Sequence, residues 1–256
     1  MSMITTMKDI KTMFWRCMLK VLRTPQALVI SIAIPAILMF LFVVVMGGSM
    51  DVGDYNVANF IVPGILVYSL VQSTSTTGVS MSQDMTTGMV NRFRSMAIPS
   101  SAFLTGHVLS GVLTTIVSTI VLFAVAFASG FRPTATLIDW LVIIGLILLL
   151  LFSITWVSVF IGVTFPDAES AGGILQLLPV LVFLSSAISP TETMPRFLRY
   201  LAENQPFTPF VNTIRALMNG YAIPNNDLQL ALIWWGGILV VTFLATIRAY
   251  KNKLTV

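Results

Sequence analysis

The residues of this chain that could do chemistry are few and scattered. It has one histidine, His107, and one cysteine, Cys17, which excludes a disulfide within the chain and a cysteine-rich metal site. Asp167 and Glu169 form an acid pair with no neighbouring base, so we expect them to be solvated or to dock a partner. No G-x-x-x-x-G-K-[ST] phosphate loop occurs. We therefore predict a chain that is not an enzyme and has no catalytic residue, metal or cofactor of its own.

A second group of polar residues lies inside apolar segments. Hydroxyl and amide side chains fill positions 72–77, and a glutamine interrupts a later apolar stretch. Two interpretations remain open: hydrogen bonds between packed helices, or a path lined with neutral polar groups for an amphiphilic solute. The candidate path residues are Tyr68, Gln72, Ser73, Thr76 and Gln176.

The composition indicates whether the helices that carry these residues lie in water or in lipid. Of the 256 residues 56% are hydrophobic and 9% are charged, whereas a globular soluble chain carries about 25% charged residues. Six apolar stretches are long enough to cross a hydrocarbon core, which takes roughly 20 helical residues. They are 26–46, 58–80, 103–129, 137–163, 172–188 and 228–247. The sequence therefore predicts an all-α integral membrane protein with six transmembrane helices.

The distribution of positive residues predicts the orientation. If the six stretches are spans, ten of the 14 Lys and Arg residues fall on the side of the two termini, and four fall on the other side. Positive residues in short loops stay in the cytoplasm. Both termini are therefore expected in the cytoplasm.

Three shorter segments are expected to be helices that do not cross. Residues 4–22 form a basic amphipathic pattern, typical of a helix lying on the membrane surface. Residues 84–96, with methionines at helical spacing, predict a cytoplasmic helix that ends before Pro99. Residues 195–220 predict two short re-entrant helices on the outer side, the second capped by Thr208, begun by Pro209 and ended at Gly220.

The composition of the spans also argues against some transport mechanisms. They carry no Asp, Glu, Lys or Arg at mid-depth; Asp84 and Asp139 lie at their edges and His107 near an inner end. Secondary transporters need an ionisable or coordinating group inside the membrane, and channels need a charged ring or a carbonyl filter. Ion-driven transport and ion conduction are therefore the weaker hypotheses.

Three stretches carry a resemblance to a known family. They are Asp-Met-Thr-Thr-Gly-Met-Val-Asn-Arg-Phe-Arg-Ser at 84–95, Phe-Pro-Asp-Ala-Glu-Ser-Ala at 165–171, and the segment 183–220 with its Asn-Gln-Pro-Phe-Thr. With these three stretches in this order, the chain resembles the permeases of type 2 ABC exporters, especially the daunorubicin-resistance-like group. His107 departs from the pattern, which often has arginine after the glycine. This weakens the expectation of a salt bridge from that position.

The resemblance implies a single permease domain over 1–256 in a bacterial cell membrane. A second permease chain, identical or different, and two copies of an ABC ATPase subunit would be its partners, besides membrane lipid. ATP and Mg would be bound by the ATPase, and no nucleic acid is involved. The 84–96 segment would be the coupling helix that docks on the ATPase, and its contact residues would be Asp84, Met89, Arg92, Phe93 and Arg94.

The function implied is export of an amphiphilic solute such as a drug, an antibiotic or a lipid-like molecule. Two alternatives remain open. One is export of a polysaccharide or glycolipid, and the other is a non-transporting membrane scaffold that binds an ATPase.

Overall fold

The computed structural model describes residues 3–45, 47, 56–89, 99–224 and 226–255, and this part of the chain contains helices and no strand. The elements are α1 Met3–Arg23, α2 Pro25–Phe40, the π-helical turn η1 Leu41–Val45, α3 Val57–Thr86, α5 Ser100–Ala128, α6 Leu137–Thr164, α7 Ala168–Phe183, the short η3 Thr191–Thr193, α8 Arg196–Glu203, α9 Phe207–Asn219 and α10 Asp227–Thr255.

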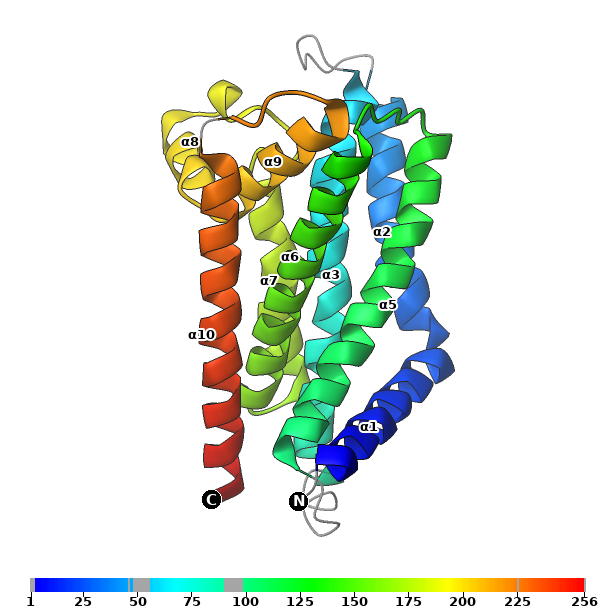
Figure 1. Ribbon diagram of the computed structural model, residues 1–256, viewed down its shortest axis with the longest axis vertical. Coiled ribbons are helices and arrows are strands. Elements are labelled where there is room, and N and C mark those ends of the chain that lie inside the picture. Colours follow the sequence, from blue (N-terminus) through cyan, green and yellow to red (C-terminus); the bar gives the residue numbers. More distant parts are fainter. Residues whose placement is uncertain (1–2, 46, 48–55, 90–98, 225, 256) are drawn as a thin grey trace.

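The longer helices run side by side along the molecule, with α3 at the centre (Figure 1). α3 packs against α2, α5, α6, α7 and α9. Of its most apolar segment 89% is buried, against 17% for the corresponding segment of α10. α1 lies obliquely across one end, the same end at which α10 finishes, and α8 and α9 lie at the other (Figure 1). Side chains on α3 are therefore positioned by contacts with most of the other helices.

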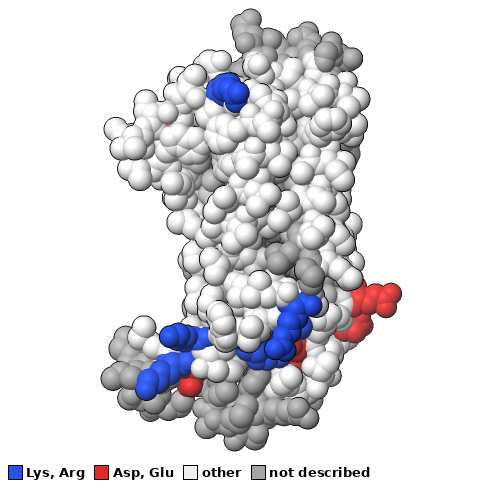
Figure 2. Space-filling model, turned by 90° about the vertical axis from the view of Figure 1, so that its right-hand side faces the viewer, with Lys and Arg blue, Asp and Glu red and all other residues white. Residues whose placement is uncertain are grey.

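The outer surface of the bundle suits lipid. Among the described helices, α3, α5, α6 and α10 are long and apolar enough to cross a membrane, and α7 and the apolar part of α2 with η1 are shorter. Leu137, Ile233 and Val241 are 80%, 71% and 65% exposed, an apolar surface that water would disfavour. On the face drawn in Figure 2, the described charged residues lie toward the two ends and leave an uncharged band between. The fold is that of a helical membrane protein.

The helix ends follow local signals in the sequence. The Asn56 side chain accepts a hydrogen bond from the Ala58 N–H at 2.9 Å at the start of α3, and Thr136 and Asp139 form a capping box at the start of α6. Asp167 accepts from the Ser170 N–H at 2.7 Å at the start of α7. That hydrogen bond holds the pKa of Asp167 below its ordinary value.

Gly220 ends α9 in the left-handed conformation with φ of 69°, as expected. The start of this helix differs from the expectation. α9 begins at Phe207 rather than Pro209, and the Thr208 hydroxyl donates to the carbonyl of Ala202 instead of capping the helix. The turn between α8 and α9 is short, so the Thr208 hydroxyl reaches a carbonyl of the preceding helix.

Two further boundaries differ from the sequence prediction. α7 ends at Phe183, whereas the fifth stretch was expected to run to 188; the chain turns at 184–188. α3 continues through Thr86, so Asp84 lies inside α3 rather than in a separate helix 84–96. Residues 90–96 of that segment lie outside the described residues. Helix α3 extends because the predicted loop begins with side chains that pack inside the protein, among them Met81 and Asp84.

Two glycines let α3 and α6 approach closely. A Cβ atom on Gly162 would collide with the carbonyl oxygen of Gly78, and one on Gly78 would collide with the carbonyl oxygen of Ser158. Small residues at helix contacts allow this approach in membrane proteins.

Gly162→Ala is expected to destabilise the protein by about 1–3 kcal/mol, because the α3 backbone must move away. Gly145 lies on the same helix, and an added Cβ atom there has nothing within 4 Å. Gly145→Ala should therefore keep or raise stability, since alanine favours a helix over glycine. Thermal unfolding of the detergent-solubilised variants measures the difference. Equal melting temperatures would contradict the close approach.

Candidate functional site

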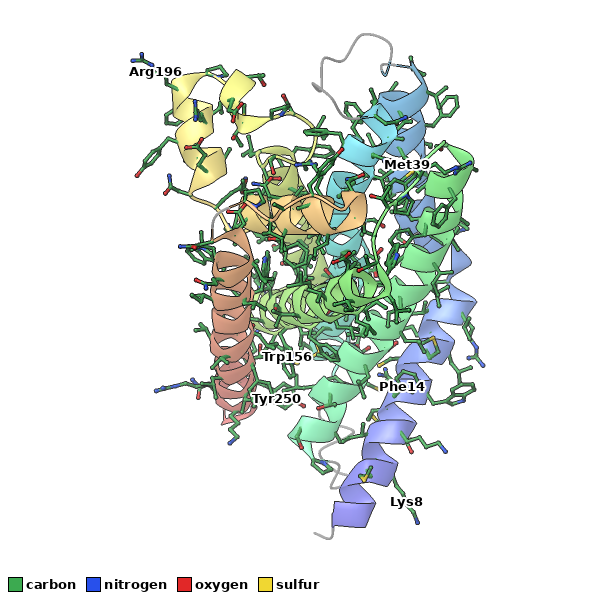
Figure 3. All side chains as sticks on the ribbon, turned by 45° about the horizontal axis from the view of Figure 1, so that its top comes forward. Lys8, Phe14, Met39, Trp156, Arg196 and Tyr250 are labelled. Carbon is green, nitrogen blue, oxygen red and sulfur yellow. The ribbon has the colours of Figure 1, made fainter. Side chains whose placement is uncertain are left out.

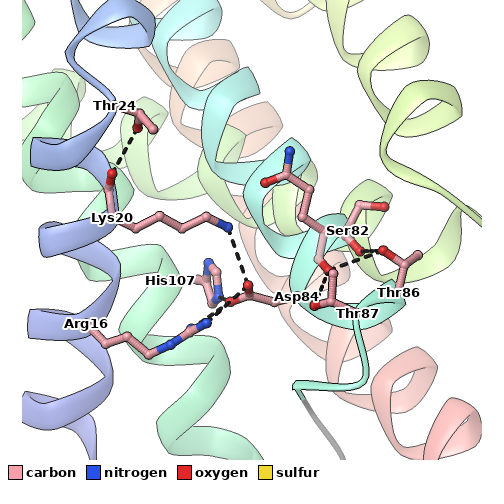
Figure 4. A network of polar contacts seen from close by, with 9 residues as sticks. Arg16, Lys20, Thr24, Ser82, Asp84, Thr86, Thr87 and His107 are labelled. Carbon is pink, nitrogen blue, oxygen red and sulfur yellow. Dashed lines mark hydrogen bonds and ion pairs between the residues drawn. The ribbon is translucent and has the colours of Figure 1, made fainter.

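A charged cluster joins α1, α3 and α5 (Figure 4). The Asp84 carboxylate on α3 accepts hydrogen bonds from Arg16 Nη1 at 2.7 Å and Nη2 at 3.2 Å, and from Lys20 Nζ at 3.4 Å. His107 Nε2 on α5 lies 3.1 Å from the same carboxylate. We call these four residues the Asp84 cluster. It connects the oblique helix α1 to the centre of the bundle.

The pairing offsets the cost of burying the carboxylate. Asp84 and His107 are 4% and 2% exposed, and a buried charge is unfavourable unless it is paired and hydrogen-bonded. The two Arg16 contacts match the forked guanidinium to both carboxylate oxygens. The hydrogen bond to Asp84 also raises the pKa of Arg16 above its ordinary value. α1 is therefore held by charge as well as by its apolar face.

Packing on α5 fixes the position of His107. The Phe103 ring meets the imidazole edge-on, with ring centroids 5.0 Å apart, and a Cβ atom on Gly106 would collide with Met13 of α1. The departure of His107 from the family pattern weakened the expectation of a salt bridge at this position. The structure shows it packed and in contact with Asp84.

A polar cavity of about 330 Å³ lies beside this cluster. Its walls come from α1, α2, α3, α5 and α7. Lys20 and His107 of the cluster line it, and most of its other lining residues are hydroxyl and amide side chains. Ligand pockets commonly start at about 300 Å³, so this space is large enough for a small solute.

One stripe of α3 opens onto the polar cavity. Between Phe60 and Asp84, every position of α3 is buried except five. These five line the cavity, and all but one are polar: Gln72, Thr76, Val79, Ser80 and Gln83. Their spacing of three and four residues keeps them on one helix face. Between Phe60 and Asp84, α3 is therefore packed on every side except one. That accessible face is mostly polar, and it lines the cavity.

The candidate path residues separate into two groups. Gln72, Thr76 and Gln176 line the polar cavity, the last from α7. Ser73 is 2% exposed and faces away from it, and Tyr68 packs against the Phe183 ring with centroids 4.8 Å apart. The structure therefore brings three of the five together.

The other interpretation of the polar run applies to two of its members, Thr74 and Ser75. Ser158 Oγ of α6 donates to Thr74 Oγ1 at 3.3 Å, and Ser75 Oγ donates to the Leu175 carbonyl of α7 at 3.3 Å. These are hydrogen bonds between packed helices, as expected for polar groups in membrane bundles. The run thus contributes both to packing between helices and to the cavity wall, which Ser75 and Thr77 also line.

Sequence reasoning missed several lining residues. Lys20 of α1 and Ser110 and Thr114 of α5 line the polar cavity but were not among the candidates. The spacing of four residues between Ser110 and Thr114 was a usable signal, because it puts both hydroxyls on one helix face. Nothing in the sequence indicated which helix that face meets.

The predicted coupling residues are only partly described. Asp84 belongs to the buried cluster, and Met89 is half-buried and packs against the apolar residues around Met81. Arg92, Phe93 and Arg94 lie outside the described residues.

A second polar site lies at the opposite end, around Arg215 of α9. Its Nε donates to the Phe60 carbonyl at 3.0 Å, and its Nη2 donates to the carbonyls of Ser186 at 2.5 Å and Ala187 at 3.3 Å. The guanidinium lies 3.9 Å from the centre of the Phe60 ring. Arg215 is one of the four positive residues that the sequence puts on the side opposite the termini. The structure buries it, and it ties α9 to α3 and to the turn after α7.

Comparisons with known proteins show the family of this chain. The family model described as ABC-2 type transporter matches residues 8–219. The daunorubicin resistance ABC transporter permease protein DrrB1 of Streptomyces coeruleorubidus is 28% identical over 247 residues, which cover 94% of this chain and 86% of that protein. The chain belongs to the ABC-2 type transporter family and is the membrane-embedded permease subunit of an ABC transporter.

Proposed function

We propose that this permease exports an amphiphilic solute, such as a drug, an antibiotic or a lipid-like molecule, out of the cytoplasm or the inner leaflet. The polar cavity carries the proposal. Its wall combines neutral hydrogen-bonding groups, including Gln72, Thr76 and Gln176, with apolar ones such as Val79, a mixture that suits an amphiphile. The similarity to a permease named for daunorubicin resistance supports a drug-like solute.

We further propose that the chain crosses the membrane six times, through α2 with η1, α3, α5, α6, α7 and α10. Both termini then lie in the cytoplasm, and α8 and α9 are re-entrant on the outer side. The distribution of Lys and Arg supports this orientation. Lys8 of α1 and Arg196 of α8 lie toward opposite ends of the molecule (Figure 3).

Single cysteines test the topology. In a Cys17→Ala background, we expect Arg196→Cys to react with a membrane-impermeant thiol reagent in intact cells. We expect Lys251→Cys, on the last turns of α10, to react only after permeabilisation. Both sites are exposed, so access depends on the membrane side alone. The reverse pattern of labelling would overturn the proposed orientation.

The energy source in this proposal is a separate ATPase that binds ATP and Mg. Two permease chains, identical or different, would assemble with two ATPase subunits docked at the end that holds α1. Asp84, Met89, Arg92, Phe93 and Arg94 would couple the two parts. The Asp84 cluster supports this role, because a displacement of α1 is passed through hydrogen bonds to α3 and α5. These residues would transmit force without bond chemistry.

Reversing two charges tests the docking surface. The double variant Arg92→Glu, Arg94→Glu is expected to weaken co-purification of the ATPase at least tenfold, because an interface that meets two cations then meets two anions. The matched control is Arg196→Glu, Arg199→Glu at the opposite end. Membrane insertion should be unchanged in both. Equal ATPase recovery from both double variants would contradict the coupling assignment.

The experiment that tests the whole proposal is reconstitution. The solubilised chain is purified from its host by affinity pull-down, and the recovered ATPase and permease are placed in liposomes. Export predicts ATPase activity that an amphiphilic solute stimulates, with ATP-dependent movement of that solute. Recovery of no ATPase overturns the proposal, an ATPase that no solute stimulates indicates a scaffold, and stimulation by a glycolipid alone indicates glycan export.

A further inference from the structure

The ionisable residues that line the polar cavity include bases but no carboxylates in the part of the chain that the structure describes. Among the described residues that line it, only Cys17, Lys20 and His107 are ionisable, and none is Asp or Glu. The wall can therefore carry positive charge and offers no carboxylate to a cationic solute.

The nearby Asp84 does not reverse this balance. Its Oδ1 accepts hydrogen bonds from Arg16 and Lys20. Its Oδ2 accepts a hydrogen bond from Arg16 and contacts His107. One carboxylate thus faces two cations and a histidine. The Asp84 cluster carries an excess of positive charge at the α1 end of the cavity.

Lys20 has hydrogen-bonding capacity to spare. An ammonium group has three N–H donors, and the Lys20–Asp84 contact is 3.4 Å, well beyond the 2.7–2.9 Å of a strong charge-assisted hydrogen bond. The Lys20 side chain is 37% exposed, and its neighbours in the cavity wall, Thr24 and Gln83, are also exposed. This end of the cavity is accessible, and Lys20 can meet an acceptor there.

The rest of the wall suits the polar body of a ligand. Among the described residues, Gln72 and Gln176 direct their amides to no protein hydrogen-bond partner, and each amide both donates and accepts. The hydroxyls of Thr76 and Thr114 donate to carbonyls of their own helices at 2.8 Å, which leaves their oxygens free to accept. The wall can therefore bind hydroxyl or amide groups beyond the charged end.

We propose that the polar cavity binds an amphiphile through an anionic head group, with Lys20 as the charged contact and the Gln72 and Gln176 amides along its polar body. This inference rests on the proposed function for the identity of the cavity as a solute site, and it adds the charge class of the solute. A membrane lipid and a free solute can share this chemistry, namely an acidic head group joined through hydrogen-bonding groups to an apolar chain.

Three amphiphiles with the same chain test the proposal: dodecyl phosphate, dodecyltrimethylammonium and dodecylphosphocholine. Each is titrated into the purified full-length chain in maltoside micelles, with empty micelles subtracted. We expect dodecyl phosphate to bind at least tenfold more tightly than the cation. Lys20→Met should remove about that factor, and Lys20→Arg should retain the binding. Lys8→Met is the matched control, because Lys8 is exposed on the same helix and lies away from the cavity.

A second variant separates the cavity from the surface. Thr76 is exposed within the cavity, so Thr76→Trp should fill the space and abolish binding while Lys20 is intact. The proposal is overturned if the cation binds as tightly as the phosphate, if Lys8→Met and Lys20→Met lose the same factor, or if Thr76→Trp has no effect. Displacement by inorganic phosphate at the same concentration would also contradict it, since the head group alone would then suffice.

Nanodiscs distinguish the two sources of ligand. If phosphatidylglycerol in phosphatidylcholine nanodiscs displaces dodecyl phosphate, the occupant is a bilayer lipid; if it does not, the occupant is a free amphiphile, and both results support the anionic site. The binding needs no ATPase. Failure to recover an ATPase therefore overturns the proposed function alone, and loss of selective binding overturns this inference alone.

Discussion

Asp84→Asn is expected to be among the most damaging single substitutions in this permease. It leaves Arg16, Lys20 and His107 facing one another without a carboxylate. Breaking a buried ion pair by removing one partner costs about 3–5 kcal/mol, and the partial exposure of Arg16 and Lys20 places this site near about 3 kcal/mol. Chemical unfolding of the detergent-solubilised protein measures the loss.

The functional loss should exceed what stability alone explains. Since Asp84 ties α1 to α3, the variant that remains folded should lose solute-stimulated ATPase activity in the reconstituted complex. Glu169→Gln is the control, because it removes an exposed carboxylate and should cost less than about 1 kcal/mol. If Asp84→Asn and Glu169→Gln behaved alike, the Asp84 cluster would be neither a structural nor a coupling element.

Arg215→Met is the second substitution with a large expected effect. Methionine keeps much of the volume of the side chain but removes the donors to the carbonyls of Phe60, Ser186 and Ala187. Each buried acceptor left unpaired costs about 1–3 kcal/mol, so a total of about 3 kcal/mol or more is expected. α9 should separate from the start of α3.

Limited proteolysis between α8 and α10, together with the melting temperature, measures this effect. Arg196→Met is the matched control, because Arg196 lies exposed on α8 and should leave both readouts unchanged. Equal protease sensitivity of the two variants would show that the Arg215 contacts do not hold the outer helices in place.

Much of the fold could be predicted because the signals are local and additive. Runs of about 20 apolar residues indicate helices in lipid, and each predicted stretch overlaps a helix of the structure. Pro195 before α8 and Gly220 after α9 mark helix ends through their own backbone preferences. The fifth stretch was harder, because its last five residues are apolar and hydroxyl-bearing yet form a turn. Hydropathy does not distinguish a buried turn from the end of a helix.

The candidate site could be predicted only in part. The position of a residue in a helix indicates which residues of the same helix share its face, but it does not indicate which other helix packs against that face. Gln72 and Thr76 were found as polar residues in an apolar stretch, and they line the polar cavity. Ser73 has the same chemistry and points elsewhere. Arg16 and Asp84 are 68 residues apart and form a forked ion pair, and no spacing rule relates them.

The sequence by itself determined that this is a helical membrane protein with basic residues gathered toward its termini, since composition, hydropathy and charge are properties of the chain alone. Only the tertiary structure decided that α3 lies at the centre, that Asp84 and Arg215 are buried rather than solvated, and that Lys20 and Gln72 line one cavity. The physical reason is that burial and pairing depend on which helix faces pack together. That choice is made by close contacts such as those of Gly78, Gly106 and Gly162, and no single segment contains them.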